Sequence, residues 1–427
     1  MEKITVAEGN EILDSRDGCN AIIRTKTNAL LAGCKSTVIP PTVTFIAVTA
    51  FAGCTGLTDI VIPDSVHTIS AAAFQGCTGL TKICIPASVT TLEVYNPYYA
   101  ETLYHPFNGC ENLVSITVDE DNPSYDSPAG SNAIISNSSL LLVGCKTTVI
   151  PETVQLIGTG AFARMPVEEI TLPDSVKAIC TAAFFQCQNL KKINLSKQLS
   201  SIEGHDRRNN KHAAFYNCVN LESLELPASL SEIGDLAFWN CKKLESIVVP
   251  AGVDYIGEAP FRGCDSLTSL VVEDGNPKYD SRDNCNAVIE TKENALVAAC
   301  NLTVIPESVT EIRNYAFSCC NKITDITIHE GVTLFGRGVF ADCEVLKSIS
   351  LLGPIKDAGN PFYSCRALET VTLGAGIKKF AEYMLDDNPV LKTIYVPAKK
   401  AAFYQKRLPE SAHSLIVEME PVKKAKK

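Results

Sequence analysis

The residues with the clearest chemical potential in this 427-residue chain are its histidines, cysteines and clustered acids. His205 and His212 lie seven positions apart with Asp206 beside the first, and imidazole and carboxylate groups are ligands that zinc accepts. The surrounding residues, from Glu203 onward, are almost all charged or polar. We therefore interpret this segment as a solvated loop and not as a metal site.

A second oxygen-rich stretch, Asp280 to Asn286, reads Asp-Ser-Arg-Asp-Asn-Cys-Asn. Its oxygen-bearing side chains alternate as in calcium loops, but the glycine and the late glutamate of such loops are missing. Turns rich in Asp and Asn account for the same composition. The chain also has no glycine-rich phosphate loop and no nucleophile elbow. We predict no metal, no cofactor and no catalytic residues, and hence that the protein is not an enzyme.

The 18 cysteines follow a pattern. Ten of them lie three residues after a phenylalanine, in the pairs Phe51/Cys54, Phe74/Cys77, Phe107/Cys110, Phe184/Cys187, Phe215/Cys218, Phe238/Cys241, Phe261/Cys264, Phe317/Cys320, Phe340/Cys343 and Phe362/Cys365. A small, soft side chain at a recurring apolar position suits a core, so we predict buried free thiols. Disulfides between stacked rows stay open as the alternative, because a row spacing of about 4.8 Å lies within the Cα separation that a disulfide accepts.

These pairs mark a repeat of 23 residues, of which Phe51 to Ala73 is one copy, with degenerate copies at Phe162 and Met384. Alternation around Ile60 and Ile62 predicts a half-buried first strand, which Pro63 ends. A turn and a short second strand follow before the next Phe. Repeats of this length cannot bury a core alone, so they predict a solenoid whose turns cover one another.

The pattern AFxxCxxLxxIxIPxSVxxI resembles the BspA-type leucine-rich repeats of bacterial surface proteins, over roughly residues 1 to 397. The resemblance implies an all-β-rich, right-handed, elongated leucine-rich-repeat solenoid with few or no regular helices, and we expect about 13 rows. It also implies a cell-surface or secreted protein that adheres to host, matrix or bacterial surface proteins.

Three related segments interrupt the repeat: Asp14 to Pro40, Asp126 to Pro151 and Asp280 to Pro306. Each has two apolar runs separated by turn residues, which predicts an inserted β-hairpin row. They divide the predicted solenoid domain, 1–397, into three supermodules of about 1–118, 119–272 and 273–397.

Two insertions are not repeated, and such loops often carry function in solenoids. The first, between Leu92 and Phe107, contains Tyr95, Tyr98, Tyr99 and Tyr104; the second, between Ile202 and Phe215, contains Arg207, Arg208 and Lys211. The outward positions of the first strand are mostly small, polar and nearly neutral, whereas binding hot spots are rich in aromatic residues and Arg. We therefore predict that these seven insertion residues contact a partner.

Residues 398–420 are expected to cap the solenoid with a short helix (398–407) and a closing strand (415–419), and 421–427 to form a disordered basic tail. The net charge of −10 argues against a nucleic-acid partner. No apolar run approaches the roughly 18 residues of a membrane helix, so we expect no membrane span. No signal peptide is recognisable at Met1, where the chain begins in mid-repeat.

The function predicted from these features is a non-enzymatic protein–protein interaction or adhesion module at the bacterial cell surface. The alternative is a structural scaffold that self-associates through its N-terminal row. The missing leader and the thiols favour the cytoplasm, while the family resemblance favours the surface, so the compartment stays open, as does the identity of the partner.

Overall fold

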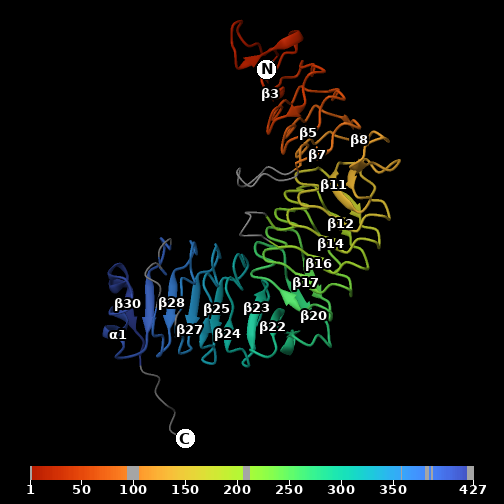
Figure 1. Ribbon diagram of the computed structural model, residues 1–427. Helices are drawn as coiled ribbons and strands as arrows, with labels where there is room; N and C mark the ends of the chain where they lie inside the picture. Colours follow the sequence, from red (N-terminus) through yellow and green to blue (C-terminus); the bar gives the residue numbers. More distant parts are fainter. Residues whose placement is uncertain are drawn as a thin grey trace. The chain divides into compact units, whose positions relative to one another are not determined.

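The computed structural model describes residues 2–93, 105–204, 212–356, 358–379, 384–385 and 388–420. Over these residues the chain winds into about 15 turns of a β-solenoid with few helices, which confirms the predicted fold class. It falls into two compact units, Met1–Phe238 (unit 1) and Trp239–Lys427 (unit 2) (Figure 1). The predicted row number, 13, was slightly low, because the three hairpin segments add turns of their own to those marked by a Phe.

A regular turn contains a first strand, a shorter second strand or both. In unit 1 the first strands are β6 (Lys82–Ile85), β8 (Ser115–Val118), β13 (Glu169–Thr171) and β15 (Lys192–Asn194), and the second strands are β4 (Phe45–Ile46), β5 (Thr68–Ile69), β7 (Thr91–Leu92), β12 (Leu156–Ile157), β14 (Ala178–Ile179), β16 (Ser201–Ile202) and β17 (Glu232–Ile233). In unit 2 the first strands are β18 (Ser246–Val249), β20 (Ser269–Val272), β25 (Asp325–Ile328), β27 (Ser348–Leu351), β28 (Thr370–Leu373) and β29 (Thr393–Val396), and the second strands are β19 (Tyr255–Ile256), β24 (Glu311–Ile312) and β26 (Leu334–Phe335).

Strands of successive turns pair in parallel at equal repeat positions. Ile83 of β6 is the partner of Ile116 of β8, and Ile46 of β4 is the partner of Ile69 of β5. Along β6 the residues are alternately exposed and buried, as the period-two pattern predicts. A slip by one residue would turn the isoleucines outward, so the hydrophobic pattern keeps the turns in register.

Between the hairpin rows, the repeated phenylalanines stack into a core column. In unit 1 the rings of Phe162, Phe184 and Phe215 stack in sequence, with centroids 5.2 and 5.1 Å apart and planes within 5° of parallel. In unit 2 the rings of Phe317 and Phe340 are 5.1 Å apart. Within each stack a ring covers the one in the preceding turn, a contact that contributes beyond its buried area.

The repeated cysteines link each turn to the one before it. The Cys187 thiol donates to the Phe162 carbonyl at 2.9 Å, and the Cys218 thiol donates to the Phe184 carbonyl at 3.1 Å. Similar bonds join Cys77 to Phe51 and Cys343 to Phe317. Burial raises the pKa of the Cys77 thiol to about 12. These residues are core thiols, as predicted, and each adds a second hydrogen bond to a carbonyl that already accepts a backbone N–H within its own turn.

The corner between Phe and Cys requires a left-handed backbone. Gly76 adopts φ of +67°, as its position in the sequence predicts, and the same place in other turns is filled by Gln186 at +55° and Asp342 at +59°. Residues with a Cβ adopt this conformation at a cost. Glycine is therefore favoured there but is not essential.

The three predicted hairpins are present. Their strands are β1 (Leu13–Asp14), β2 (Ile22–Arg24) and β3 (Ala29–Ala32), then β9 (Tyr125–Asp126), β10 (Ala133–Ser136) and β11 (Leu140–Gly144), and β21 (Tyr279–Asp280), β22 (Ala287–Glu290) and β23 (Ala295–Ala299), with 3₁₀ turns η1 (Arg16–Gly18) and η2 (Arg282–Asn284). The last two strands of each hairpin pair antiparallel, and the final strand then pairs in parallel with the next turn.

The oxygen-rich stretch that begins at Asp280 stabilises the third hairpin, and Asp280 itself is the central residue. Its carboxylate accepts two hydrogen bonds from Arg282, at 2.8 and 2.6 Å, and one from Thr291 at 2.8 Å. The first hairpin repeats the arrangement, and there the bond from Arg16 lowers the pKa of Asp14 to about 2. The acids thus fix the hairpin through an internal ion pair.

The hairpin row contributes no phenylalanine to the core column. Gly33 and Gly144 lie in the corresponding place, and a Cβ on either would collide with the ring of Phe51 or Phe162 from the next turn. In these two hairpins the neighbouring ring occupies the space of the missing side chain, whereas the third hairpin has Ala299 at the equivalent place, paired with Ala287 as Gly144 is paired with Ala133.

The ladder of second strands is interrupted at the second and third hairpins, after β7 and after β19. At each of these breaks a tyrosine hydroxyl bonds to the last second strand. The Tyr125 hydroxyl accepts the Leu92 N–H of β7 at 2.9 Å, and the Tyr279 hydroxyl accepts the Ile256 N–H of β19 at 3.2 Å. Each side chain thus replaces a ladder bond at the break.

Unit 2 ends in α1 (Ala401–Gln405), η3 (Glu410–Leu415) and β30 (Ile416–Glu418), close to the predicted helix and strand. β30 pairs in parallel with β29, Ile416 facing Ile394. The buried Tyr404 of α1 donates its hydroxyl to the Gly374 carbonyl, which anchors the helix to the solenoid.

Replacing Phe184 with Ala should lower the free energy of unfolding by about 3–5 kcal/mol, because the cavity is buried between two stacked rings. Urea unfolding measures this loss. The exposed Gln188 of the same turn provides the control substitution, Gln188→Ala, which should change stability little. A loss below about 1 kcal/mol for Phe184→Ala would contradict the role of the column.

Removing the Tyr279 hydroxyl in Tyr279→Phe should cost about 1–3 kcal/mol, because the buried Ile256 N–H loses its acceptor. Hydrogen exchange of the Ile256 amide should accelerate in parallel. Tyr395→Phe, at a more exposed tyrosine, is the matched control, and equal effects of the two substitutions would argue against the hydroxyl as a ladder substitute.

The buried His105 should make the free energy of unfolding depend on pH. It is fully buried, its Nδ1 accepts the Phe107 N–H at 3.2 Å, and its Nε2 has no partner. Burial lowers the pKa of His105 to about 3. The unfolded chain therefore binds the proton first, and stability that is present above about pH 6.5 is lost as the pH falls toward 3.

We expect the free energy of unfolding to fall between pH 6 and 4 by about 1.4 kcal/mol per pH unit more in the native protein than in His105→Leu. Urea titrations at several pH values compare the two slopes. Parallel slopes would show that His105 does not titrate in this way.

Candidate functional site

The seven predicted contact residues, Tyr95, Tyr98, Tyr99, Tyr104, Arg207, Arg208 and Lys211, lie outside the described residues. Their placement as a binding site stays a prediction. The described residues on either side of each insertion show where it joins the solenoid.

Both insertions join unit 1 at the same place in the repeat. One follows β7 and the other follows β16, and each ends just before a Phe of the core column. Glu93 and Glu203, which precede them, accept the N–H of Ala71 and Thr181 from the preceding turn, at 3.3 and 2.7 Å. The two insertions therefore start from one edge of unit 1, which we call the corner edge: the residues between the second strand and the repeated Cys.

The second insertion has a closed base. The Ala214 N–H donates to the Glu203 carbonyl at 3.1 Å, so the chain leaves and re-enters the corner edge at adjacent points. A Cβ on Gly204 would collide with the backbone of Asp235 in the next turn, which explains a glycine at this exit. The solenoid thus holds both ends of the insertion against neighbouring turns.

An aromatic cluster lies at this base. The ring of His212 stacks on Phe185 with centroids 4.5 Å apart and lies 4.9 Å from Tyr216, and Phe185 stacks on Tyr216 at 5.4 Å. The guanidinium of Arg164 lies 5.7 Å from the Phe185 ring. These residues form one aromatic and cationic column on the corner edge, a composition typical of binding hot spots.

Unit 2 has a related cluster at its own corner edge. The Arg262 guanidinium lies 5.0 Å from the Trp239 ring and 5.5 Å from the Tyr315 ring. The guanidinium of Arg337 also lies near the Tyr315 ring, at 5.4 Å. Arg262 also forms an ion pair with Asp342 at 2.5 Å.

A sequence signal for both clusters exists in the residue after each repeated Phe. In consecutive repeats it is Phe185, Tyr216, Trp239 and Arg262, whereas the earlier repeats carry Ala52, Gln75, Asn108 and Ala163. The sequence interpretation followed the strand positions, which are mostly polar, and so missed this run of large side chains at the corner.

The outer face of the first-strand sheet is more apolar than its columns predict. Val38, Val149 and Val304 of the hairpin rows are 72%, 66% and 69% exposed, and Val61 is 78% exposed. A hollow of about 370 Å³ over β6 and β8 contains Val61 and the exposed Cys84 between Asp59 and Asp119. The lining of this hollow contains neither aromatic residues nor Arg, so the corner edge remains the stronger candidate.

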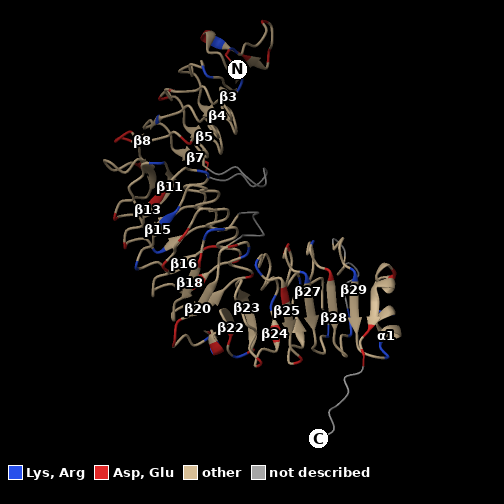
Figure 2. Cartoon of the chain, turned by 180° about the vertical axis from the view of Figure 1, so that it is seen from behind, with Lys and Arg blue, Asp and Glu red and all other residues tan. Residues whose placement is uncertain are grey.

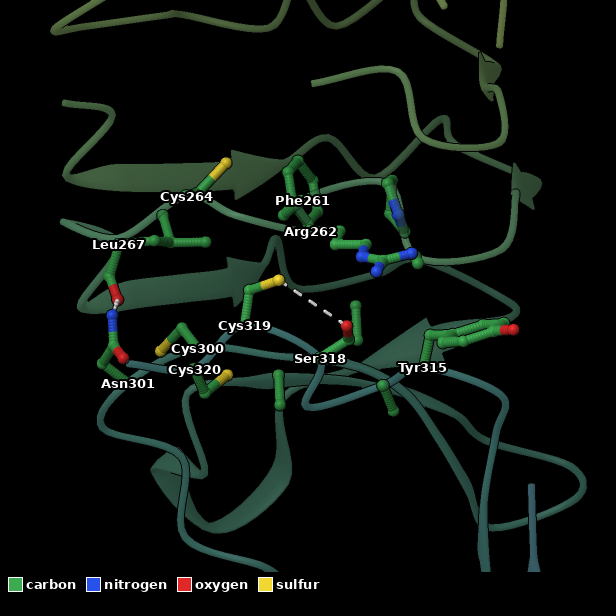
Figure 3. Close-up of a pocket in the computed structure, with 15 residues that line it drawn as sticks. Phe261, Arg262, Cys264, Leu267, Cys300, Asn301, Tyr315, Ser318, Cys319 and Cys320 are labelled. Atoms are coloured by element: carbon green, nitrogen blue, oxygen red, sulfur yellow. Dashed lines mark hydrogen bonds between the residues drawn. The ribbon is translucent and has the colours of Figure 1, made fainter. Parts of the chain in front are cut away.

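The densest group of thiols lines a small cavity of about 20 Å³ in unit 2 (Figure 3), formed by Cys264, Cys300, Cys319 and Cys320 with Arg262. Burial raises the pKa of all four thiols, although Arg262 opposes the effect at Cys319. A catalytic cysteine needs a lowered pKa. This arrangement therefore packs a core and does not activate a nucleophile.

Charges are mixed along both units, with Lys and Arg interspersed among Asp and Glu (Figure 2). Within the described ranges, no three His, Cys, Asp or Glu side chains are grouped so that they would hold a metal. Among the same residues, none of the helices has the length and apolar character needed to cross a membrane.

Comparisons with known proteins agree with the fold. The chain matches the model of the BspA type leucine rich repeat region (6 copies) over residues 27–136, 133–205, 207–285 and 292–409. No curated protein matches it.

Several solved structures are similar. One is the pneumococcal vaccine antigen PcpA (21% identity, 93% of this chain and 82% of that one, TM-score 0.45). Another is a leucine-rich repeat protein from Bacteroides ovatus (22% identity, 98% and 99%, TM-score 0.43). A third is a leucine-rich cell surface protein from Faecalibacterium prausnitzii (18% identity, 98% and 96%, TM-score 0.48).

The family model covers most of the chain, and the matched ranges contain the buried Phe and Cys positions of the repeats. This chain therefore belongs to the BspA-type leucine-rich repeat family.

Proposed function

We propose that this protein is a non-enzymatic scaffold that binds a protein partner through the corner edge of unit 1. The observation that carries the proposal is that both non-repeated insertions leave this one edge, with the column of Arg164, Phe185, His212 and Tyr216 at the base of the second. Leucine-rich repeat families are scaffolds for protein–protein interaction, and this chain shares their repeated architecture.

The binding energy would come from a few large side chains in the two insertions. Tyr95, Tyr98, Tyr99 and Tyr104 would provide large, rigid contact area, and Arg207, Arg208 and Lys211 would provide charged contacts. Tyrosine and arginine dominate binding energy when they are desolvated near the centre of an interface. A rigid edge that fixes the ends of both insertions would lower the entropy lost when they order on a partner.

Adhesion at the bacterial cell surface is part of the same proposal and rests on the family membership. The partner would be a host, matrix or bacterial surface protein.

The test compares four purified proteins: the native chain, a variant with the four insertion tyrosines changed to Ala, a variant with Arg207, Arg208 and Lys211 changed to Ala, and a control carrying Val61→Ser on the sheet face. A partner captured from host or bacterial surface extracts is identified by mass spectrometry, purified, and titrated against each. We expect each insertion variant to bind at least about 30-fold more weakly, because a hot spot contributes about 2 kcal/mol or more.

The control should bind as the native chain does. Unchanged affinity of both insertion variants, together with weakened binding by the Val61→Ser protein, would move the site to the sheet face and overturn the proposal. Capture of only a second copy of this chain would favour the self-associating scaffold instead.

A further inference from the structure

Unit 2 contains a hollow of about 270 Å³ at its hairpin. Figure 1 shows the hairpin strands β22 and β23. Its walls include Tyr255 of β19, Lys278 and Tyr279 at β21, Glu290 of β22 and Arg313 after β24, and Val297 of β23 also lines it. Tyr255 is 46% exposed, whereas Tyr279 is 4% exposed. One tyrosine therefore presents its ring to solvent, while the other belongs to the framework.

The hollow follows from the break in the second-strand sheet. β19 lies at the end of its sheet, and the Tyr279 hydroxyl accepts its Ile256 N–H. Between β19 and β24 the hairpin strands take the place of a regular second strand. This replacement leaves a space between β19 on one side and the hairpin strands with β24 on the other.

The second hairpin, in unit 1, shows which residues this framework requires. There Tyr125 caps Leu92 in the same way, so the framework tyrosine is kept. The lining is not kept: where the third hairpin carries Tyr255, Lys278, Glu290 and Arg313, the corresponding residues of the second are Thr91, Ser124, Ser136 and Gly158. The hairpin therefore folds without the aromatic and charged side chains of the lining. Their presence in the third hairpin is explained better by binding than by folding.

The lining is electrically balanced. Glu290 pairs with Arg313 at 3.1 Å, Glu258 pairs with Arg337 at 3.3 Å, and the Lys278 ammonium donates to the Asp254 carbonyl at 2.8 Å. Within the hollow, Lys278 and Arg313 offset Glu258 and Glu290, so the net charge is zero. An ionic ligand would gain little from such a site.

Instead, donors and acceptors lie side by side. Lysine and arginine only donate, carboxylates only accept, and the amide of Asn314 does both. A ligand hydroxyl, which donates and accepts, matches this arrangement. The exposed Tyr255 ring adds a flat apolar surface with a polar end. The volume is just below the roughly 300 Å³ at which ligand pockets usually begin, which suits a single ring.

We propose that the hollow at the third hairpin binds one ring of a neutral saccharide, with Tyr255 against the face of the ring and Lys278, Glu290 and Asn314 toward its hydroxyls. This site is distinct from the corner edge of unit 1, and the two proposals stand or fall separately.

The test titrates the full chain with glucose, galactose, mannose and N-acetylglucosamine, and with glucosamine and glucuronate as cationic and anionic counterparts. Saturation-transfer NMR and calorimetry follow binding up to tens of millimolar. We expect saturable binding of at least one neutral sugar and at least tenfold weaker binding of its charged counterparts.

The two test variants are Tyr255→Thr and Lys278→Ser. Each places in the hollow the residue that the second hairpin has at the same position, and the second hairpin folds with these residues. Each should weaken sugar binding at least tenfold while leaving the circular dichroism spectrum and thermal midpoint close to native. Tyr395→Thr removes a comparably exposed tyrosine outside the hollow and should bind as the native chain does.

Three results would overturn the inference. The first is the absence of saturable binding by every neutral sugar in the set. The second is tighter binding of a charged sugar than of the neutral ones. The third is unchanged affinity in folded Tyr255→Thr and Lys278→Ser proteins, which would place any bound sugar elsewhere.

Discussion

The rest of the structure depends on one contact, the stacking of each phenylalanine ring on the ring of the preceding turn. A single repeat of 23 residues has two short strands and no interior of its own, so its apolar face must be covered by a neighbour. Parallel rings about 5 Å apart match the spacing that the strand ladders impose. The thiols of repeated cysteines such as Cys187 and Cys218 reach the carbonyl of the previous Phe, so the same corner supplies apolar contact and a hydrogen bond.

The hairpin rows show how this regularity can be interrupted without exposing the core. Where a Phe is missing, Gly33 or Gly144 lets the next ring approach, and where the second-strand sheet ends, a tyrosine hydroxyl accepts the orphaned N–H. An unpaired buried N–H would cost about 1–3 kcal/mol. These side-chain and glycine substitutions compensate for the interruptions. In unit 2, the hollow of the proposed saccharide site lies beside the bond between Tyr279 and Ile256.

Our proposal places partner recognition at the departures from the repeat. The strand faces are constrained by register and carry small side chains at most outward positions, whereas the corner edge is the place where both insertions join unit 1 and where large side chains occur. The aromatic cluster of Phe185, His212 and Tyr216 shows that such residues gather where an insertion begins and ends. Burial raises the pKa of repeated thiols such as those of Cys77 and Cys320, so the recurrence of cysteine at this position reflects packing.

The sequence by itself determined the solenoid, the inward Phe and Cys, the three hairpins and the closing helix and strand, because each is encoded locally by periodicity or turn residues. It also located the two insertions in the chain. Only the tertiary structure decided that both insertions leave one edge, that Arg262 lies between Trp239 and Tyr315, and that Tyr255, Glu290 and Arg313 enclose a hollow. These relations join residues one or more turns apart, and their geometry depends on how turns stack around an interrupted row, which no local pattern specifies.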